Sequence, residues 1–193
     1  MKISPKFVIK VAGTLTVIAL VTAALLGLVD GVTRDKIAEI EAEKTRIAMS
    51  AVTPAGSEFT DKLEIPAAAA EAAAAQGGKV LELYGVKSGG CVMKISASGS
   101  QGAIVMMVGV DANKAITGIS VVSHAETSGI GTKVVGNELN DAGVPVLDQF
   151  IGLSGSGSLV VKKNIVPITT ATVSTKGITM GANAALAAAE ALG

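Results

Sequence analysis

The chain has 193 residues, no net formal charge and a pI near 6.6, and 49% of its residues are hydrophobic while only 2% are aromatic. This length allows one globular domain with a sizeable core. The balanced charge, and the lack of zinc-finger, helix-turn-helix or RNA-recognition signatures, argue against nucleic acid as a partner.

The only cysteine, Cys91, cannot form an internal disulfide. With a single histidine as well, the sequence offers no ligand set for zinc or for a cysteine-ligated iron–sulfur centre, so no metal site is expected. Cys91 lies in the alternating stretch "CVMKISA", where a buried core thiol is favoured over a reactive one.

Residues 11–29 form an uncharged run, "VAGTLTVIALVTAALLGLV". A helix rises about 1.5 Å per residue, so this run is long enough for the roughly 30 Å hydrocarbon core of a bilayer. Lysines at positions 2, 6 and 10 precede it, which predicts a cytoplasmic N-terminus (residues 1–10) and an exported C-terminal part on the outer face of the cell membrane. A cleaved signal peptide is the alternative. The length of the run favours a retained single-pass transmembrane helix.

Residues 30–78 are expected to form a helical stalk followed by an Ala-rich segment. Ile37, Ile40 and Ile47 recur at helical spacing among charged residues, which is typical of an amphipathic helix. The stretch "PAAAAEAAAAQGG" begins with proline and ends with two glycines, the usual limits of a helix. Neither segment is given a chemical role.

Residues 79–193 are expected to form one α+β domain. Four β-rich runs, "KVLELYGVK", "CVMKISAS", "GAIVMMVGV" and "AITGISVVSH", are separated by turn signals and predict an antiparallel meander.

Beyond the meander, the sequence predicts a short helix at residues 133–139, a strand in "GSGSLVVKK" and a last helix in "KGITMGANAALAAAEAL". An antiparallel sheet with flanking helices fits this order best.

The first candidate site is "SHAETSGIGTK", residues 123–133, directly after the last strand of the meander. Gly129 and Gly131 permit positive φ angles or close approach to a ligand. Glu126 and Thr127 add a carboxylate and a hydroxyl. Taken alone, this stretch is also compatible with a surface loop, and its histidine is not expected to bind a metal.

The second candidate is "ITTATVSTKG", residues 168–177, which holds five hydroxyl side chains just ahead of the last helix. If that helix begins near Lys176, Ser174 or Thr175 could simply cap it. The same helix start would also favour an anion, so a phosphate could lie beside the loop or be carried covalently on a threonine. Local chemistry leaves both interpretations open.

Together, and behind one membrane anchor, the two stretches resemble motifs of the FMN-binding domain family. "HAETSGIGTK" is similar to the family's H-x-E-T-P-G-x-G-x-K segment, and "TTATVST" is similar to its S/T-G-A-T-x-T/S flavinylation motif. Over roughly residues 8–192, the chain resembles the G subunits of the Rnf complex, a membrane-bound ferredoxin:NAD⁺ oxidoreductase. The C subunit of the sodium-translocating NADH:quinone oxidoreductase is similar but usually longer.

The resemblance implies that FMN is joined through its phosphate, as a phosphoester, to Thr172. Val166 and Thr170 stand where the family has aspartate and glycine, departures that bear on recognition by the flavin transferase but keep the acceptor hydroxyl. In the first segment, Ser128 stands where the family has proline. The implied noncovalent contacts to the cofactor come from Glu126, Thr127, Gly129, Gly131, Lys133, Thr169, Thr170, Ala171, Val173, Ser174 and Thr175.

The function that this resemblance implies is electron transfer by a membrane-anchored flavoprotein subunit that contributes to ion translocation. No nucleophile–base pair or carboxylate dyad indicates a self-contained enzyme, and the flavin would supply the redox chemistry. The implied partners are the other subunits of the complex, membrane lipid, and the flavin transferase during maturation. The alternatives are an exported scaffold or ligand-binding module of the same fold without covalent flavin, and a stand-alone flavoprotein shuttle.

Overall fold

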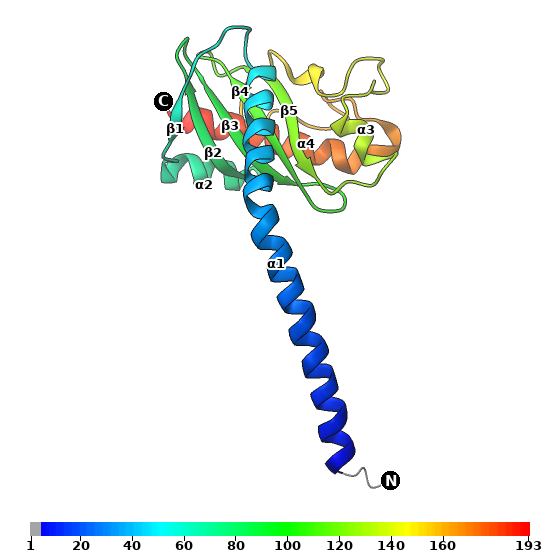
Figure 1. Ribbon diagram of the computed structural model, residues 1–193. Coiled ribbons are helices and arrows are strands. Elements are labelled where there is room, and N and C mark those ends of the chain that lie inside the picture. The colour runs from blue at the N-terminus through cyan, green and yellow to red at the C-terminus, as the bar shows by residue number, and fades with distance from the viewer. Residues whose placement is uncertain (1–4) are drawn as a thin grey trace. The chain divides into compact units, whose positions relative to one another are not determined.

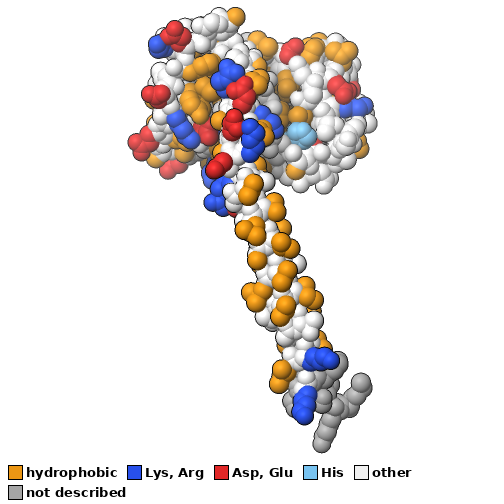
Figure 2. Space-filling view, in the orientation of Figure 1, with side chains coloured by type: hydrophobic (Ala, Val, Ile, Leu, Met, Phe, Trp, Pro, Cys, Tyr) orange, Lys and Arg blue, Asp and Glu red, His pale blue; other side chains and the backbone are white. Residues whose placement is uncertain are grey.

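The computed structural model describes residues 5–193 and separates into two units, of which the first ends at Glu43 and the second runs from Lys44 to Gly193. The first unit consists of most of helix α1, Pro5–Ala51. Figure 2 shows hydrophobic side chains around this helix, with lysines at one end of the apolar stretch. The helix is long and apolar enough to cross a membrane.

The polar groups within the apolar stretch of α1 are satisfied by the helix itself. The hydroxyls of Thr14, Thr16 and Thr22 donate to backbone carbonyls four residues earlier, at 2.9 to 3.0 Å. Such internal bonding is what a hydrocarbon environment requires. Charge resumes at Asp30, which pairs with Arg34 at 2.6 Å.

The second unit is built on a five-stranded antiparallel sheet in the order β1-β2-β3-β4-β5. The predicted meander and the α+β class are confirmed, and β1 is an additional edge strand that the sequence did not predict. The strands are β1 (Phe59–Leu63), β2 (Gly78–Val86), β3 (Cys91–Ser98), β4 (Ala103–Val110) and β5 (Ile116–His124). Cys91 is buried, as expected.

Helices α2 (Ala67–Ala75) and α4 (Thr172–Ala191) cover one face of this sheet (Figure 1). Small residues allow α4 to approach closely. A Cβ atom at Gly177 would lie 2.6 Å from the carbonyl oxygen of Ser98, and one at Gly181 would lie 2.6 Å from Met106 Cε. The position of α4 on the sheet is therefore fixed by contacts near its start, which is where the candidate motif lies.

The end of α1, from Lys44 onward, packs against the other face of the sheet. Met49 and Val52 form a buried cluster there with Val92 of β3 and Met107 of β4. Gly109 and Gly118, directly paired on β4 and β5, make room for Val52. A Cβ atom at Gly109 would lie 2.2 Å from the Val52 carbonyl oxygen, which accepts a hydrogen bond from Thr117 Oγ1.

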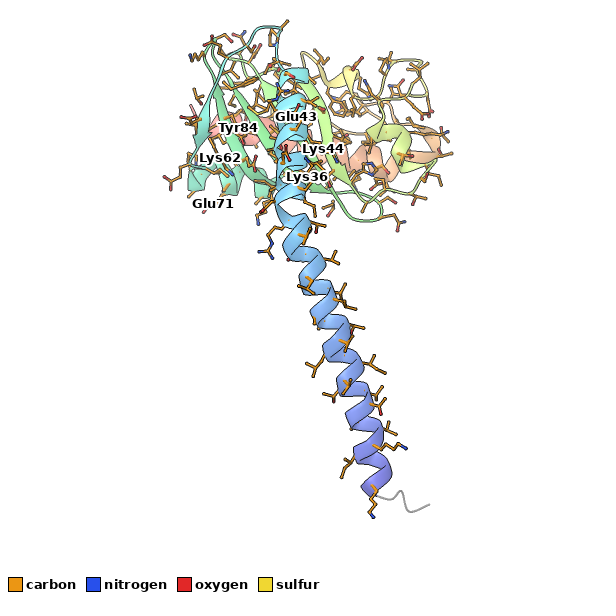
Figure 3. All side chains as sticks on the ribbon, viewed as in Figure 1. Lys36, Glu43, Lys44, Lys62, Glu71 and Tyr84 are labelled. Carbon is orange, nitrogen blue, oxygen red and sulfur yellow. The ribbon has the colours of Figure 1, made fainter. Side chains whose placement is uncertain are left out.

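A charged cluster lies on β1 to β3, where Lys62 and Tyr84 occupy paired positions on adjacent strands (Figure 3). The Tyr84 hydroxyl donates to Glu82 Oε2 at 2.8 Å, and the amines of Lys62 and Lys94 lie 3.4 and 3.6 Å from Glu82 Oε1. Burial raises the pKa of Tyr84 to about 12, and the Glu82 hydrogen bond adds to the shift. Burial also acts to raise the pKa of Glu82, but the Tyr84 hydrogen bond and the two lysine charges outweigh it and lower that pKa.

Two expectations are corrected here. The compact unit begins at Lys44, so residues 44–78 are largely part of the domain: Ala69 and Ala73 of α2 are buried, and β1 pairs with β2. The stretch expected as a strand, "GSGSLVVKK", forms a loop with one isolated bridge, Val161 to Ile165. The side chains of Asn164 and Asn183 form hydrogen bonds with backbone N–H and C=O groups of this loop, which in a strand would pair with a neighbouring strand.

The remaining elements are short. The helix expected at residues 133–139 is α3, Gly131–Val135, and it ends earlier than expected because Gly136 follows it as the C-cap. Two 3-10 turns complete the domain: η1 (Asp148–Phe150) and η2 (Thr169–Ala171).

Candidate functional site

The two predicted motifs meet in space, around a cavity of about 250 Å³ that we call the motif cavity. It lies where the end of β5, the start of α3 and the start of α4 come together. Its lining residues are Ser100, Glu126, Thr127, Ile130, Gly131, Thr169, Thr170, Ala171, Thr172, Val173 and Ser174.

Three of the predicted site residues do not line the motif cavity. Gly129 is in the turn before α3, with a φ of +74° and its N–H bonded to Thr132 Oγ1 at 2.9 Å. Lys133 lies in α3. Thr175 is buried, and its hydroxyl donates to the Ala171 carbonyl at 3.1 Å.

Helix α4 begins at Thr172, one turn earlier than the expected start near Lys176. Ser174 and Thr175 are therefore inside the helix and do not cap it; the N-cap position is Ala171, which has no side-chain cap. The reason is tertiary: both hydroxyls find buried partners, Glu126 for Ser174 and the Ala171 carbonyl for Thr175. The first turn of α4 leaves backbone N–H groups free to face an anion.

The five hydroxyls of the motif are not equally available. Three of them donate hydrogen bonds inside the protein: Thr169 to Asp141, Ser174 to Glu126, and the buried Thr175 to the Ala171 carbonyl. Thr172 Oγ1 makes only a long bond, 3.3 Å to the Thr169 carbonyl. The hydroxyl of Thr170, an exposed residue, has no hydrogen-bond partner within residues 5–193. Of the motif's hydroxyls, those of Thr170 and Thr172 are thus the freest to react.

Glu126 is buried, with 8% of its surface exposed, and ties three segments together. Its Oε1 accepts from the Ser100 N–H at 2.7 Å, and its Oε2 accepts from the Ser174 hydroxyl. A Cβ atom at Gly131 would lie only 2.2 Å from Oε2, so this glycine is needed for the close approach. Both carboxylate oxygens accept hydrogen bonds from the protein. The main role of Glu126 in this structure is therefore to hold the loop after β5 in place.

Asp141 holds the 3-10 turn η2 from outside the motif. Its carboxylate accepts from both the Thr169 N–H, at 3.1 Å, and the Thr169 hydroxyl. The Asp141 N–H in turn donates to the Pro167 carbonyl at 3.3 Å. Because the Thr169 carbonyl is the acceptor for Thr172 Oγ1, Asp141 positions the residue that orients the Thr172 hydroxyl.

Sequence reasoning missed Asp141, Ser100 and Ile130 at this site. Ser100 could have been predicted, because in an antiparallel meander the turn between β3 and β4 lies at the same end of the strands as the C-terminal end of β5. Ile130 lies within the first motif, "SHAETSGIGTK". No local signal marks Asp141, which is 28 residues away from Thr169.

A second cavity, of about 400 Å³, adjoins the first and shares Thr172 with it. We call it the lysine cavity. Its walls are mostly apolar, with lysines from both sides. The residues that line it are Leu159, Val160, Val161, Lys162, Thr172, Lys176, Thr179, Met180 and Asn183.

The two cavities suit an anionic ligand with an apolar ring. The motif cavity offers hydroxyls and the start of a 20-residue helix, where a phosphate is favoured. The lysine cavity offers apolar walls and positive charge, and its volume lies within the roughly 300 to 1,000 Å³ of small-molecule sites. The residues present therefore fit a phosphorylated ring cofactor, with Thr172 between the two parts.

Fold and site define a flavin-binding class of protein, an FMN-binding domain behind a membrane-length helix. Residues 99–187 match the FMN-binding domain family, and residues 1–52 match the RnfG N-terminal region. The chain belongs to the family of G subunits of Rnf-type ion-translocating oxidoreductase complexes.

Relatives in bacteria and archaea support this membership. The G subunit of the Na⁺-translocating ferredoxin:NAD⁺ oxidoreductase complex of Acetobacterium woodii is 32% identical over 196 residues, covering 92% of this chain and 89% of that protein. The G subunit of the ion-translocating oxidoreductase complex of Methanosarcina acetivorans is 31% identical, covering 78% of this chain and 81% of that protein. The corresponding subunit of Cereibacter sphaeroides is 29% identical, covering 74% of each chain.

Proposed function

We propose that this chain is the flavoprotein subunit of an Rnf-type complex and carries electrons through an FMN that is covalently attached to Thr172. The FMN supplies the redox chemistry when it is bound, and the protein sets its position and surroundings. The observation that supports the proposal is the place of Thr172: this residue lines both the motif cavity and the lysine cavity, and its hydroxyl makes only one long hydrogen bond.

The attachment requires an activated flavin phosphate, because condensing free FMN with a hydroxyl in water is unfavourable. The donor would be a flavin phosphoanhydride. The Thr172 oxygen bonds to phosphorus as the anhydride P–O bond breaks, a nucleoside monophosphate leaves, and the hydroxyl proton passes to a base. No oxidation or reduction occurs. A flavin transferase acting from outside this chain would carry out the step.

Residues of both motifs would then support the bound cofactor. Thr170 and the first residues of α4 line the motif cavity, so the N–H groups of this turn and the Thr170 hydroxyl would support the phosphoester there. Glu126 and Asp141 would keep the two loops in register through the bonds described above. Three predicted residues do not line the motif cavity and would support the residues that do: Gly129, Lys133 and Thr175.

We further propose that residues 11–29 cross the cell membrane once, with residues 1–10 in the cytoplasm and the domain on the outer face. The lysines before the apolar run support this orientation. Membrane lipid and the other subunits of the complex would then be permanent partners, and the flavin transferase would be a transient partner. Electron transfer through this subunit would contribute to ion translocation by the whole complex.

Denaturing gels test the attachment directly. Full-length protein, co-expressed with a flavin transferase, should fluoresce under ultraviolet light after denaturation, and its intact mass should exceed the sequence mass by FMN less one water. Thr172→Ala should abolish both signals. Thr170→Ala, which removes the other uncommitted hydroxyl, is the matched control and should keep them.

Other outcomes separate the alternatives. Fluorescence lost in Thr170→Ala but kept in Thr172→Ala would move the acceptor to Thr170. A parent protein that never gains flavin in a host with an active transferase would favour the scaffold without covalent flavin, in line with the unusual Thr170 and Val166. Flavinylated protein that purifies from its native membrane without other subunits would favour the stand-alone shuttle.

A further inference from the structure

Positive charge is concentrated in one long stretch of the domain. Residues 149–189 contain three lysines and no aspartate or glutamate, although the chain as a whole has 16 basic and 16 acidic residues. The three are Lys162 and Lys163, which are neighbours in a loop, and Lys176, in the second turn of α4. This stretch therefore has no acidic side chain of its own to neutralise its lysines.

The structure leaves these three lysines exposed and unpaired. Lys162 and Lys176 both line the lysine cavity, and Lys163 directly follows Lys162. Their amines make no hydrogen bond or ion pair with any of the described residues. On the sheet, by contrast, the Lys94 amine lies 3.6 Å from the Glu82 carboxylate. We call the surface formed by Lys162, Lys163 and Lys176 the lysine face.

Two of these lysines occupy positions that folding alone does not favour. Lys162 has a φ of +69°, in the left-handed region that glycine and asparagine adopt more readily than lysine. Lys176 follows the first turn of α4, which contains no acidic residue, so its charge lies near the positive end of the helix dipole. Strained positions are found preferentially at functional sites. Both positions therefore indicate a role for the lysines outside the fold.

The loop that carries two of the lysines, residues 159–163, is held in place. The buried Asn183 side chain of α4 accepts from the Leu159 N–H at 3.3 Å and donates to the Leu159 carbonyl at 2.9 Å. Asn164 accepts from the Val160 N–H at 2.7 Å. The backbone of the lysine face is thus preorganised. Such a surface suits docking against another folded surface, because less conformational freedom is lost on binding.

Exposed apolar side chains accompany the lysines. Val160, which is 44% exposed, lines the lysine cavity, and Val173, which is 58% exposed, lies in the first turn of α4. Protein–protein contacts commonly combine an apolar centre with a polar rim. Binding to anionic lipid by charge usually takes a cluster of about four to eight basic residues, more than the three of this face. The lysine face therefore fits a protein partner, and the contact surface of that partner must be acidic.

We propose that the lysine face docks an acidic surface of another protein subunit of the complex. The inference rests on the proposed assembly of this chain into an Rnf-type complex. It adds the face of the domain that makes the contact and the charge that the partner carries there. Complementary charges steer two such surfaces together and fix their register.

Docking is measured with the full-length protein in detergent and the remaining subunits purified from cells that lack this one. Lys162→Glu together with Lys176→Glu should weaken binding at least about tenfold at low salt, which corresponds to about 1.4 kcal/mol. Raising the salt from about 0.1 M to about 1 M shortens the Debye length from roughly 10 to 3 Å, so the parent and the variant should converge. Lys79→Glu together with Lys87→Glu, at exposed lysines that line neither cavity, is the matched control and should bind like the parent.

Lys162→Asn separates docking from folding. It removes one charge and places at the positive φ a residue that adopts this conformation more readily. The urea midpoint of this variant should therefore equal or exceed that of the parent, while its docking at low salt becomes weaker. A midpoint that falls while docking is unchanged would mean that Lys162 serves the fold, and would remove it from the lysine face.

Vesicles test the membrane as the competing target. Full-length Val173→Cys protein, labelled with an environment-sensitive dye, is reconstituted in phosphatidylcholine vesicles with and without phosphatidylglycerol. The dye should report the same aqueous surroundings in both. A shift that appears only in the anionic vesicles, and that Lys162→Glu removes, would assign the lysine face to lipid and overturn the proposal.

The outcomes also separate this inference from the function proposed above. If flavin attaches to Thr172 and the parent assembles, but the Lys162 and Lys176 variants bind like the control pair at every salt concentration, this inference alone fails. If Thr172 never carries flavin but docking shows the salt dependence described, the covalent-flavin proposal fails and the docking surface stands.

Discussion

Ser174 donates a hydrogen bond from its hydroxyl to Oε2 of Glu126, a residue 48 positions earlier in the chain, and both partners are buried. This bond joins the two motifs that stand apart in the sequence. Replacing Glu126 by alanine would leave the Ser100 N–H and the Ser174 hydroxyl without their acceptor. We expect Glu126→Ala to destabilise the domain by about 1.5 to 3 kcal/mol, the usual worth of hydrogen bonds to a charged group.

Urea unfolding of the flavin-free full-length protein in detergent, followed by circular dichroism, measures this loss. Glu138→Ala, at an exposed position on the next segment, is the matched control and should change little. An unchanged unfolding free energy for Glu126→Ala would mean that the carboxylate is not needed by the fold and is free to serve a ligand.

Asp141 should control how fast the flavin is attached. Its carboxylate fixes Thr169, whose carbonyl orients the Thr172 hydroxyl. We expect Asp141→Ala to slow flavinylation by about tenfold, since at least one hydrogen bond to a charged group is lost in ordering the acceptor. Asp141→Asn keeps one acceptor oxygen and should fall between the alanine variant and the parent. The measurement is the rate at which gel fluorescence appears with purified transferase; equal rates for all three proteins would remove Asp141 from the site.

Tyr84 should titrate near pH 12 in the folded protein. Burial and the bond to Glu82 favour the neutral phenol, so its folded pKa lies above the ordinary value of 10. The stabilising contribution is complete below pH 10 and is lost as pH rises from 10 through 12, because the unfolded chain releases its phenol proton first. Tyr84 is the chain's only tyrosine, so tyrosinate absorbance after a rapid pH jump isolates it. Glu82→Gln should move the midpoint towards 10; a parent midpoint of 10 with the fold intact would contradict the assignment.

Cysteine labelling tests the orientation of the membrane helix. Ser88 is exposed in the domain, so Ser88→Cys should react with a membrane-impermeant maleimide in intact cells or spheroplasts. Ser4→Cys, on the other side of the apolar run, should react only after lysis. The parent supplies the background, which should be low because burial raises the pKa of the Cys91 thiol. The reverse labelling pattern would place the domain in the cytoplasm.

The sheet could be predicted because its strands carry the signal. Alternation places Met106 against the α2 and α4 face and Met107 against the end of α1, and turn residues separate the runs. The edge strand β1 was missed because its five residues are mostly polar and mostly exposed, which gives no alternating pattern. Its strand character comes from pairing with β2, a tertiary effect.

The site was predictable only as far as the two motifs extend. The early start of α4 could not be predicted, because the β-branched and hydroxyl residues at positions 172–175 favour caps and loops over helix until buried partners hold them. Asp141 and the lysine cavity depend on contacts between distant segments. The Asn183 amide, for example, forms the cavity wall only once α4 lies beside Leu159.

The close packing of Gly177 against Ser98 has a bearing on how variants of this protein would fail. Any larger residue at position 177 must lift the start of α4 away from the sheet, since its Cβ would lie 2.6 Å from a backbone oxygen. The remaining contacts of α4 with the sheet and α2 would still hold the rest of the helix. The misplaced part would be the first turn of α4, which carries Thr172, the acceptor in the function proposed above. Under that proposal, such a variant would reach the membrane and persist there without flavin, so it would be detected as a maturation defect in cells with normal amounts of the protein.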